Sequence, residues 1–202
     1  MTTDKPLRAD ARRNREAIVT AAREVFDAGR FFDMRYDDLA SLAGVGTGTL
    51  YRNFPTREAL AEAVYRSEIA TLSDRARRLG ATRSADEALA LFLRDMIDHI
   101  DAHQGLARTL ATLMSAGSGG GSGHELEDAV AELVAAGVAD GSLRDDVDAG
   151  AVLMALHGIG AAHARPGWRA EADGVVTLVV DGLRRDAAVG DRTAGAEPEP
   201  HG

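Results

Sequence analysis

The feature that most constrains the fold is the segment 36–53, in which two short helical patterns follow each other across a single glycine. In the first pattern, four apolar residues recur at helical spacing: Tyr36, Leu39, Ala40 and Ala43. This spacing predicts a helix over about 36–43. Gly44 follows at once, and glycine permits the sharp turn that two helices packed at a steep angle require.

The second pattern, Thr47–Asn53, predicts a short helix that is almost free of bulky side chains. With Gly46 as its N-cap, Val45 and Leu50 stand at the two positions of a hydrophobic staple. Its other positions carry small or hydrogen-bonding groups: Thr47, Gly48, Thr49, Tyr51, Arg52 and Asn53. A helix that enters a DNA major groove, about 12 Å wide, needs such a surface. The two patterns together indicate a helix-turn-helix arrangement.

Helical patterns also flank this segment. A first helix is predicted from about Asp10, a plausible N-cap, to Ala28, with Gly29 placed to end it. Its apolar residues share one face: Ile18, Ala21, Ala22, Val25 and Phe26. Pro55 breaks the chain after the second short helix, and Thr56 can cap a long helix that continues toward Leu79.

The rest of the chain also predicts helices. They are expected at about 85–103, 106–116, 124–140, 147–164 and 170–186. The β-branched residues from Val175 to Val180 also fit a strand, but a lone strand would have no partner, so a helix is predicted. The glycine- and serine-rich stretch 117–123 predicts a flexible surface loop.

The predicted fold class is therefore all-α, with an N-terminal three-helix helix-turn-helix head on a C-terminal helical bundle. The expected division is a DNA-binding head at 1–55, a helical body at 56–186, and a disordered tail at 187–202.

Composition excludes several classes of site. The 202 residues include no cysteine, which excludes disulfides, thiolate metal sites and cysteine nucleophiles. No apolar run approaches the roughly 20 residues of a membrane span, and no signal-peptide core is present, so a soluble cytoplasmic protein with no membrane partner is expected. There is no nucleophile elbow, phosphate-binding loop or recognisable carboxylate pair, so neither an enzyme nor a cofactor is predicted. An interaction bundle that never meets DNA would not need so polar a short helix.

Charge is distributed unevenly along the chain. The net charge is −9, yet residues 1–66 carry 11 Lys and Arg against 10 Asp and Glu, while residues 67–202 carry 12 against 22. Five basic residues lie within a stretch of eleven residues near the N-terminus: Lys5, Arg8, Arg12, Arg13 and Arg15. This cluster is either a DNA-contacting arm or a solvated tail. The asymmetry fits a small DNA-facing head on an acidic body.

The first third of the chain resembles the TetR/AcrR family of bacterial transcriptional repressors. The likeness covers about residues 8–66 and rests on three motifs in register. These are RxxIxxAAxxxF (Arg15, Ile18, Ala21, Ala22 and Phe26) with Gly29, LAxxAGVxxGTLYxxF (Leu39 to Phe54), and TREAL (Thr56 to Leu60).

The resemblance implies a set of contacts to double-stranded DNA. The predicted contact residues are Arg35, Thr47, Gly48, Thr49, Tyr51, Arg52, Asn53 and Arg57. Tyr51 and Arg57 match the family's phosphate-binding positions. The sequence departs from the family pattern at three positions: Arg35 replaces a Thr or Ser cap, Gly46 replaces a Ser, and Asn53 replaces a common His. Arg35 either reaches a phosphate or is simply an exposed arginine, and both interpretations stay open.

The resemblance further implies a homodimer that binds a palindromic operator and is released by a small-molecule effector. It also implies that the body binds a ligand and forms the dimer. The apolar helix 147–164, together with 170–186, is the candidate dimer interface, with Gly160 and Val179 expected at the seam. Small residues would allow close helix approach: Gly158, Gly160, Ala161, Ala162 and Ala164. The alternative is a helix buried within one subunit.

Candidate effector-binding residues are taken from the apolar or boundary positions of the body. They are Phe92, Met96, His99, His103, Met114, Met154, His157 and Trp168. His99 and His103 have the spacing of a two-histidine metal clip, with Asp95 one turn back. The preferred interpretation is that both are boundary histidines of a packed helix, and no metal site is predicted.

Overall fold

The structure is a computed structural model that describes residues 4–103 and 123–185. Its helices are α1 (Asp4–Asp27), α2 (Tyr36–Leu42), α3 (Thr47–Asn53), α4 (Arg57–Gly80), α5 (Ala85–Ala102), α7 (Gly123–Asp140), α8 (Ala149–Ala161) and α9 (Trp168–Leu183). Within the described residues there is no strand, only an isolated antiparallel bridge between Leu143 and Arg184. The all-α prediction is confirmed, and Val175 to Val180 lie in a helix.

Several predicted segments lie outside the described residues. They are the helix 106–116 with Met114, most of the loop 117–123, and the tail 187–202.

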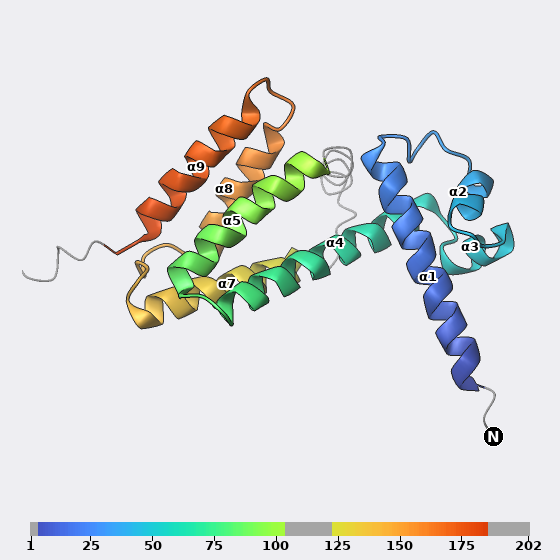
Figure 1. Cartoon of the computed structure of the whole chain (residues 1–202), viewed down its shortest axis with the longest axis horizontal. Coiled ribbons are helices and arrows are strands. Elements are labelled where there is room, and N and C mark those ends of the chain that lie inside the picture. Colours follow the sequence, from blue (N-terminus) through green and yellow to red (C-terminus); the bar gives the residue numbers. More distant parts are fainter. Residues whose placement is uncertain (1–3, 104–122, 186–202) are drawn as a thin grey trace, which may run out of the picture.

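The head gathers at one end of the molecule, where α1, α2 and α3 surround the first turns of α4 (Figure 1). Its core includes Ile18, Phe26, Leu39 and Leu50, all buried. Leu60, Ala61 and Val64 of α4 belong to the same core, so α4 contributes to the head beyond residue 55. Because α4 is shared, the head is fixed to the helix that leads into the body.

In the body, the far part of α4 packs against α5 and α7, while α8 and α9 pack on α5, α7 and each other (Figure 1). Its core begins on α4 at Ile69 and includes Phe92, Leu93 and Ile97 of α5. Leu143 packs into this core so closely that a Cβ on Gly137 would lie 2.4 Å from its Cδ1 atom. Among the described helices, none combines the length and the apolar character needed to cross a lipid bilayer.

The start of the first helix differs from the prediction. Helix α1 begins at Asp4, two turns before the expected Asp10. Pro6 falls in the first turn of the helix, where its missing N–H has no intrahelical acceptor to lose, so proline does not stop the helix there. The prediction treated Asp10 as a cap, but its carboxylate instead pairs with Arg13 one turn later.

Candidate nucleic-acid interface

Local backbone chemistry sets the angle between α2 and α3. Gly44 has φ of +66°, a left-handed conformation that glycine adopts without steric cost. The Val45 amide then donates to the Ala40 carbonyl at 3.0 Å and closes the turn. Leu50 is fully buried and Val45 packs against the same core, as the hydrophobic staple predicts. Helix α3 is therefore anchored by Leu50 on its inner face, while Gly48, Tyr51 and Arg52 on its outer face are exposed.

The outer face of α3 is polar and carries little bulk. Gly48, Tyr51 and Arg52 are exposed, and Thr47, Thr49 and Asn53 are half-buried. Two of these residues bond to Thr49: Arg52 Nη2 donates to its Oγ1 at 3.0 Å, and Asn53 Nδ2 donates to its carbonyl at 2.8 Å. A Cβ on Gly48 would meet nothing within 4 Å, so the surface beside it is open. The structure thus brings together all six predicted contact residues of α3 on one short helix.

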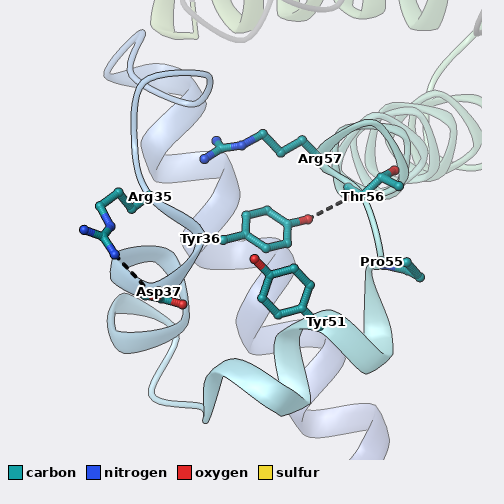
Figure 2. A pocket seen from close by; sticks show the side chains of 7 residues that line it. All are labelled: Arg35, Tyr36, Asp37, Tyr51, Pro55, Thr56 and Arg57. Carbon is teal, nitrogen blue, oxygen red and sulfur yellow. Dashed lines mark hydrogen bonds and ion pairs between the residues drawn. The ribbon is translucent and has the colours of Figure 1, made fainter.

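A hollow of about 350 Å³ lies next to α3, between the start of α2 and the start of α4 (Figure 2). It is lined by Arg35, Tyr36, Asp37, Tyr51, Pro55, Thr56 and Arg57. The Tyr36 hydroxyl donates to the Thr56 carbonyl at 2.7 Å, and the Tyr51 ring packs against Tyr36 at 5.1 Å. Burial raises the pKa of the Tyr36 hydroxyl, and the nearby Arg57 charge offsets this only in part. Tyr36 therefore remains a neutral hydrogen-bond donor that ties α2 to α4.

The arginines of this hollow have different surroundings. Arg57 donates to the carbonyls of Phe31 and Met34, and its guanidinium lies 5.3 Å from the centre of the Tyr36 ring. It thereby holds the loop before α2 against α4, a positioning role that the sequence did not reveal. Arg35 is largely exposed and pairs with Asp37 at 3.5 Å. As expected at the N-cap of α2, Arg35 makes no side-chain capping bond.

The hollow has the chemistry of a phosphate site. Its guanidinium and hydroxyl groups are those that proteins direct at the DNA backbone, and the hollow adjoins a helix suited to a groove. Tyr51 is 49% exposed, so its hydroxyl can reach a ligand. The phosphate contacts of Tyr51, Arg35 and Arg57 remain predictions.

A further arginine, outside the predicted contact set, fixes the end of α3. Arg15 of α1 donates to the Asn53 carbonyl at 3.5 Å and lies 4.4 Å above the Phe54 ring. Two of the other basic residues are paired on α1 itself, Arg12 with Glu16 and Arg13 with Asp10. Both interpretations of the basic cluster stay open.

The candidate effector residues are not brought together as one set. Phe92 is fully buried, Met96 is half-buried on the same helix, and the Trp168 Nε1 donates to the Ile159 carbonyl at 2.7 Å. His157 is exposed and Met154 is 75% exposed, so both face away from the body core. Between α5, α8 and α9 the side chains leave no space for even a water molecule, whereas small ligand sites have roughly 300 Å³.

The two-histidine clip does not form a metal site. No group of three or more His, Cys, Asp and Glu side chains in residues 4–103 and 123–185 could hold a metal ion. Asp95 pairs with Arg75 at 2.6 Å, whereas His99 and His103 pair with carboxylates on other helices. The carboxylate partners of His99 and His103 are Glu68 and Asp27, which come from distant parts of the chain.

The seam positions predicted for a dimer point into the subunit. A Cβ on Gly160 would lie 3.4 Å from Ile100 of α5, and Val179 packs against the body core. The exposed apolar residues of α8 and α9 are instead Met154, Val175 and Leu178. The reason is that α8 is apolar on every side, so its periodicity does not reveal which face is inward.

Comparisons with known proteins agree with this geometry. Residues 18–64 match the family described as bacterial regulatory proteins, tetR family, and residues 84–185 match the C-terminal domain of transcriptional regulators similar to SbtR. A TetR transcriptional regulator from Streptomyces coelicolor is 40% identical, with a TM-score of 0.68, over 86% of this chain and 99% of that one. A TetR regulatory protein from Mycobacterium vanbaalenii is 34% identical, with a TM-score of 0.67, over 89% and 100%.

One curated protein, an HTH-type transcriptional regulator from Staphylococcus aureus, is 34% identical over 58 residues. That match spans 28% of this chain and 30% of the relative, so this chain covers less than a third of that relative's length.

Proposed function

Because the chain belongs to the TetR family of DNA-binding transcriptional regulators, we propose that it is a ligand-responsive repressor that binds a palindromic operator as a homodimer. The observation that carries the proposal is the polar outer face of α3, held outward by the Gly44 turn and the buried Leu50. In this proposal Thr47 and Thr49 meet base edges, while Tyr51, Arg35 and Arg57 grip the flanking phosphates. Bacterial DNA lies in the cytoplasm, which is where we expect the protein to act.

The dimer is supported by the apolar surface of α8 and α9. Met154 and Leu178 are 75% and 73% exposed in the single chain, and a cluster of large exposed apolar residues typically marks a protein interface. A second copy packed on the same surface would cover both. Two recognition helices related by a two-fold axis would meet half-sites about 34–36 Å apart, or a multiple of that spacing.

Repression and response to an effector are what membership of the family implies. A small molecule that binds the body releases the operator only if it favours an arrangement of the heads that DNA does not accept. Phe92, Met96, His99 and Trp168 remain our candidates for the effector site.

Footprinting tests the proposal. The full chain is titrated onto the DNA that flanks its own gene, and the protected sequence is mapped. We expect a protected palindrome whose half-sites lie one or two helical turns apart. Sedimentation at the same protein concentrations should give a dimer. Protection without two-fold symmetry, or a monomer that binds operator tightly, would contradict the dimer, while no protection anywhere in that DNA would contradict regulation of neighbouring genes.

A further inference from the structure

Five ionisable side chains from three helices meet between the head and the body. We call this cluster the joint: Arg23 and Asp27 of α1, Glu68 of α4, His99 of α5, and His103 at the C-cap of α5. The C-terminal ends of α1 and α5 face each other beside α4 at this point (Figure 1). None of these residues belongs to the DNA-facing surface or to the α8–α9 surface.

Glu68 is the centre of the joint. Its side chain is only 3% exposed, and its two oxygens are shared between the helices on either side. Arg23 pairs with Oε1, and His99 Nε2 lies 3.2 Å from Oε2. Burial raises the pKa of the Glu68 carboxyl, but the hydrogen bond from His99 and the charge of Arg23 outweigh it and hold the pKa below its usual value. A buried carboxylate that lost these partners would be strongly destabilised, so Glu68 keeps both helices close.

A second contact lies beside the first. His103 Nδ1 is 2.9 Å from Asp27 Oδ2, and the two histidine rings are 4.7 Å apart. Both partners of this contact remain about one third exposed. Helix α1 is therefore linked to the end of α5 directly through Asp27 and indirectly through Arg23 and Glu68, and two links resist a rotation that one contact would allow.

The joint lies where apolar packing is divided. On α4 the head core ends at Val64 and the body core begins at Ile69, with Glu68 between them. Apolar contact is non-directional, whereas each ion pair of the joint requires two particular groups to lie close together. We propose that the joint positions the head on the body, and that Arg23, Glu68 and His99 are positioning residues that set the spacing of the two recognition helices. This inference rests on the proposed function, because spacing matters only for a dimer on a palindrome.

The test measures the distance between heads directly. The chain has no cysteine, so Ser41→Cys, on an exposed position of α2, places one spin label on each subunit. Pulsed electron–electron double resonance then gives the distance between the two spin labels, and hence between the heads, in the DNA-free dimer. Affinities for the footprinted operator and for a random duplex of equal length are measured on the same variants without the label.

Two variants separate positioning from folding. Glu68→Gln removes the charge and leaves Arg23 unpaired. The double variant Arg23→Met with Glu68→Leu leaves no unpaired charge, and such apolar replacements often restore stability. The matched control is Asp95→Asn, which breaks an ion pair between α4 and α5 that does not involve α1.

For both joint variants we expect a broader head-to-head distance distribution and operator affinity lower by roughly tenfold, a typical size for coupling between sites. Random-duplex affinity should stay within about twofold, because each head keeps its own phosphate contacts. The double variant should unfold near the wild-type denaturant midpoint, and Asp95→Asn should match wild type in every measurement.

A double variant with wild-type distance width and operator affinity would overturn the proposal, because the pair would then serve folding alone. If the double variant does not fold, Asp27→Asn takes its place, since it weakens only the contact with His103, whose two side chains are about one third exposed. An unchanged distance distribution in Asp27→Asn would likewise contradict the proposal that the joint positions the head. Failure of the proposed function is distinct: absence of a dimer or of an operator would be evident in the wild-type protein.

Discussion

The outer face of α3 and the outer face of α8 and α9 are both open to solvent, yet their chemistry is opposite. The first presents threonines, a glycine, an arginine and an asparagine around Tyr51. The second presents Met154, Val175 and Leu178 among small residues. A groove edge is recognised by hydrogen bonds, while a second protein surface is recognised by apolar area. The difference indicates that the two faces have two different kinds of partner.

The largest effect is expected from a charge on the apolar face. Leu178→Arg should weaken dimerisation by about 2–4 kcal/mol, because an unpaired guanidinium would be buried at the seam. Sedimentation should show monomers, and operator binding should be lost although Leu178 does not lie on the DNA-binding head. Ala136→Arg, on an exposed position of α7, is the control and should remain dimeric. If Leu178→Arg sediments as a dimer, the α8–α9 seam is wrong.

A substitution on the polar face should change specificity and leave assembly intact. Thr49→Val keeps the shape of the side chain and removes the hydroxyl that Arg52 contacts. We expect a change in base preference of roughly 1–3 kcal/mol at one position of each half-site, measured by competition between variant operators. Thr71→Val on an exposed position of α4 should show no change. An unaltered preference would argue against base readout by Thr49.

Substitutions at the edge of the same face should weaken binding to operator and to random DNA by similar amounts. Tyr51→Phe keeps the ring against Tyr36 and removes only the hydroxyl, so operator and random DNA should each lose about 1 kcal/mol of binding.

Arg35→Ala should lower the slope of log affinity against log salt concentration by about 0.9 per head if Arg35 neutralises a phosphate. The measurement is affinity against salt concentration. An unchanged slope for Arg35→Ala would leave it a plain exposed arginine.

The smallest effect concerns stability in acid and should leave both faces untouched. The pKa of Glu68 lies below the ordinary 4.5, so its ionised form stabilises the fold above that pH. This contribution is lost as the pH falls from about 4.5 through the lower folded-state pKa. Glu68→Gln should therefore lose less stability than wild type between about pH 5 and pH 3. Denaturant midpoints at one protein concentration test this, and equal losses in both proteins would contradict it.

Much of the head could be predicted because its signals are local. The bounds of α3 were predicted residue by residue, since Gly46, the staple and Pro55 lie within ten positions of one another. The hydrogen bonds of Arg57 to Phe31 and Met34 could not be predicted, because they depend on how a loop folds back over α4. Likewise, the spacing of His99 and His103 placed them on one face, but only the fold places Glu68 and Asp27 beside them.

The body was predicted in outline only. Those of its helices that the structure describes were placed within a few residues, because glycine, proline and charge mark their ends. Which side of α8 points inward could not be deduced, because apolar residues surround this helix and give it no preferred face. Gly160 of α8 was assigned to the seam for that reason, and Val179 was assigned with it on α9, whereas Met154 and Leu178 are the exposed residues.

Helix α4 runs unbroken through both cores for 24 residues. Each residue of an α-helix advances the chain by about 100° and 1.5 Å, so the length of α4 sets the rotational phase of the head against the body. One residue inserted between Val64 and Ile69 would turn the head by that angle relative to the body. In the proposed dimer, α3 would then no longer face the major groove of its half-site. In the proposed dimer, a change in the length of α4 would therefore alter the placement of the two recognition helices in steps of whole residues.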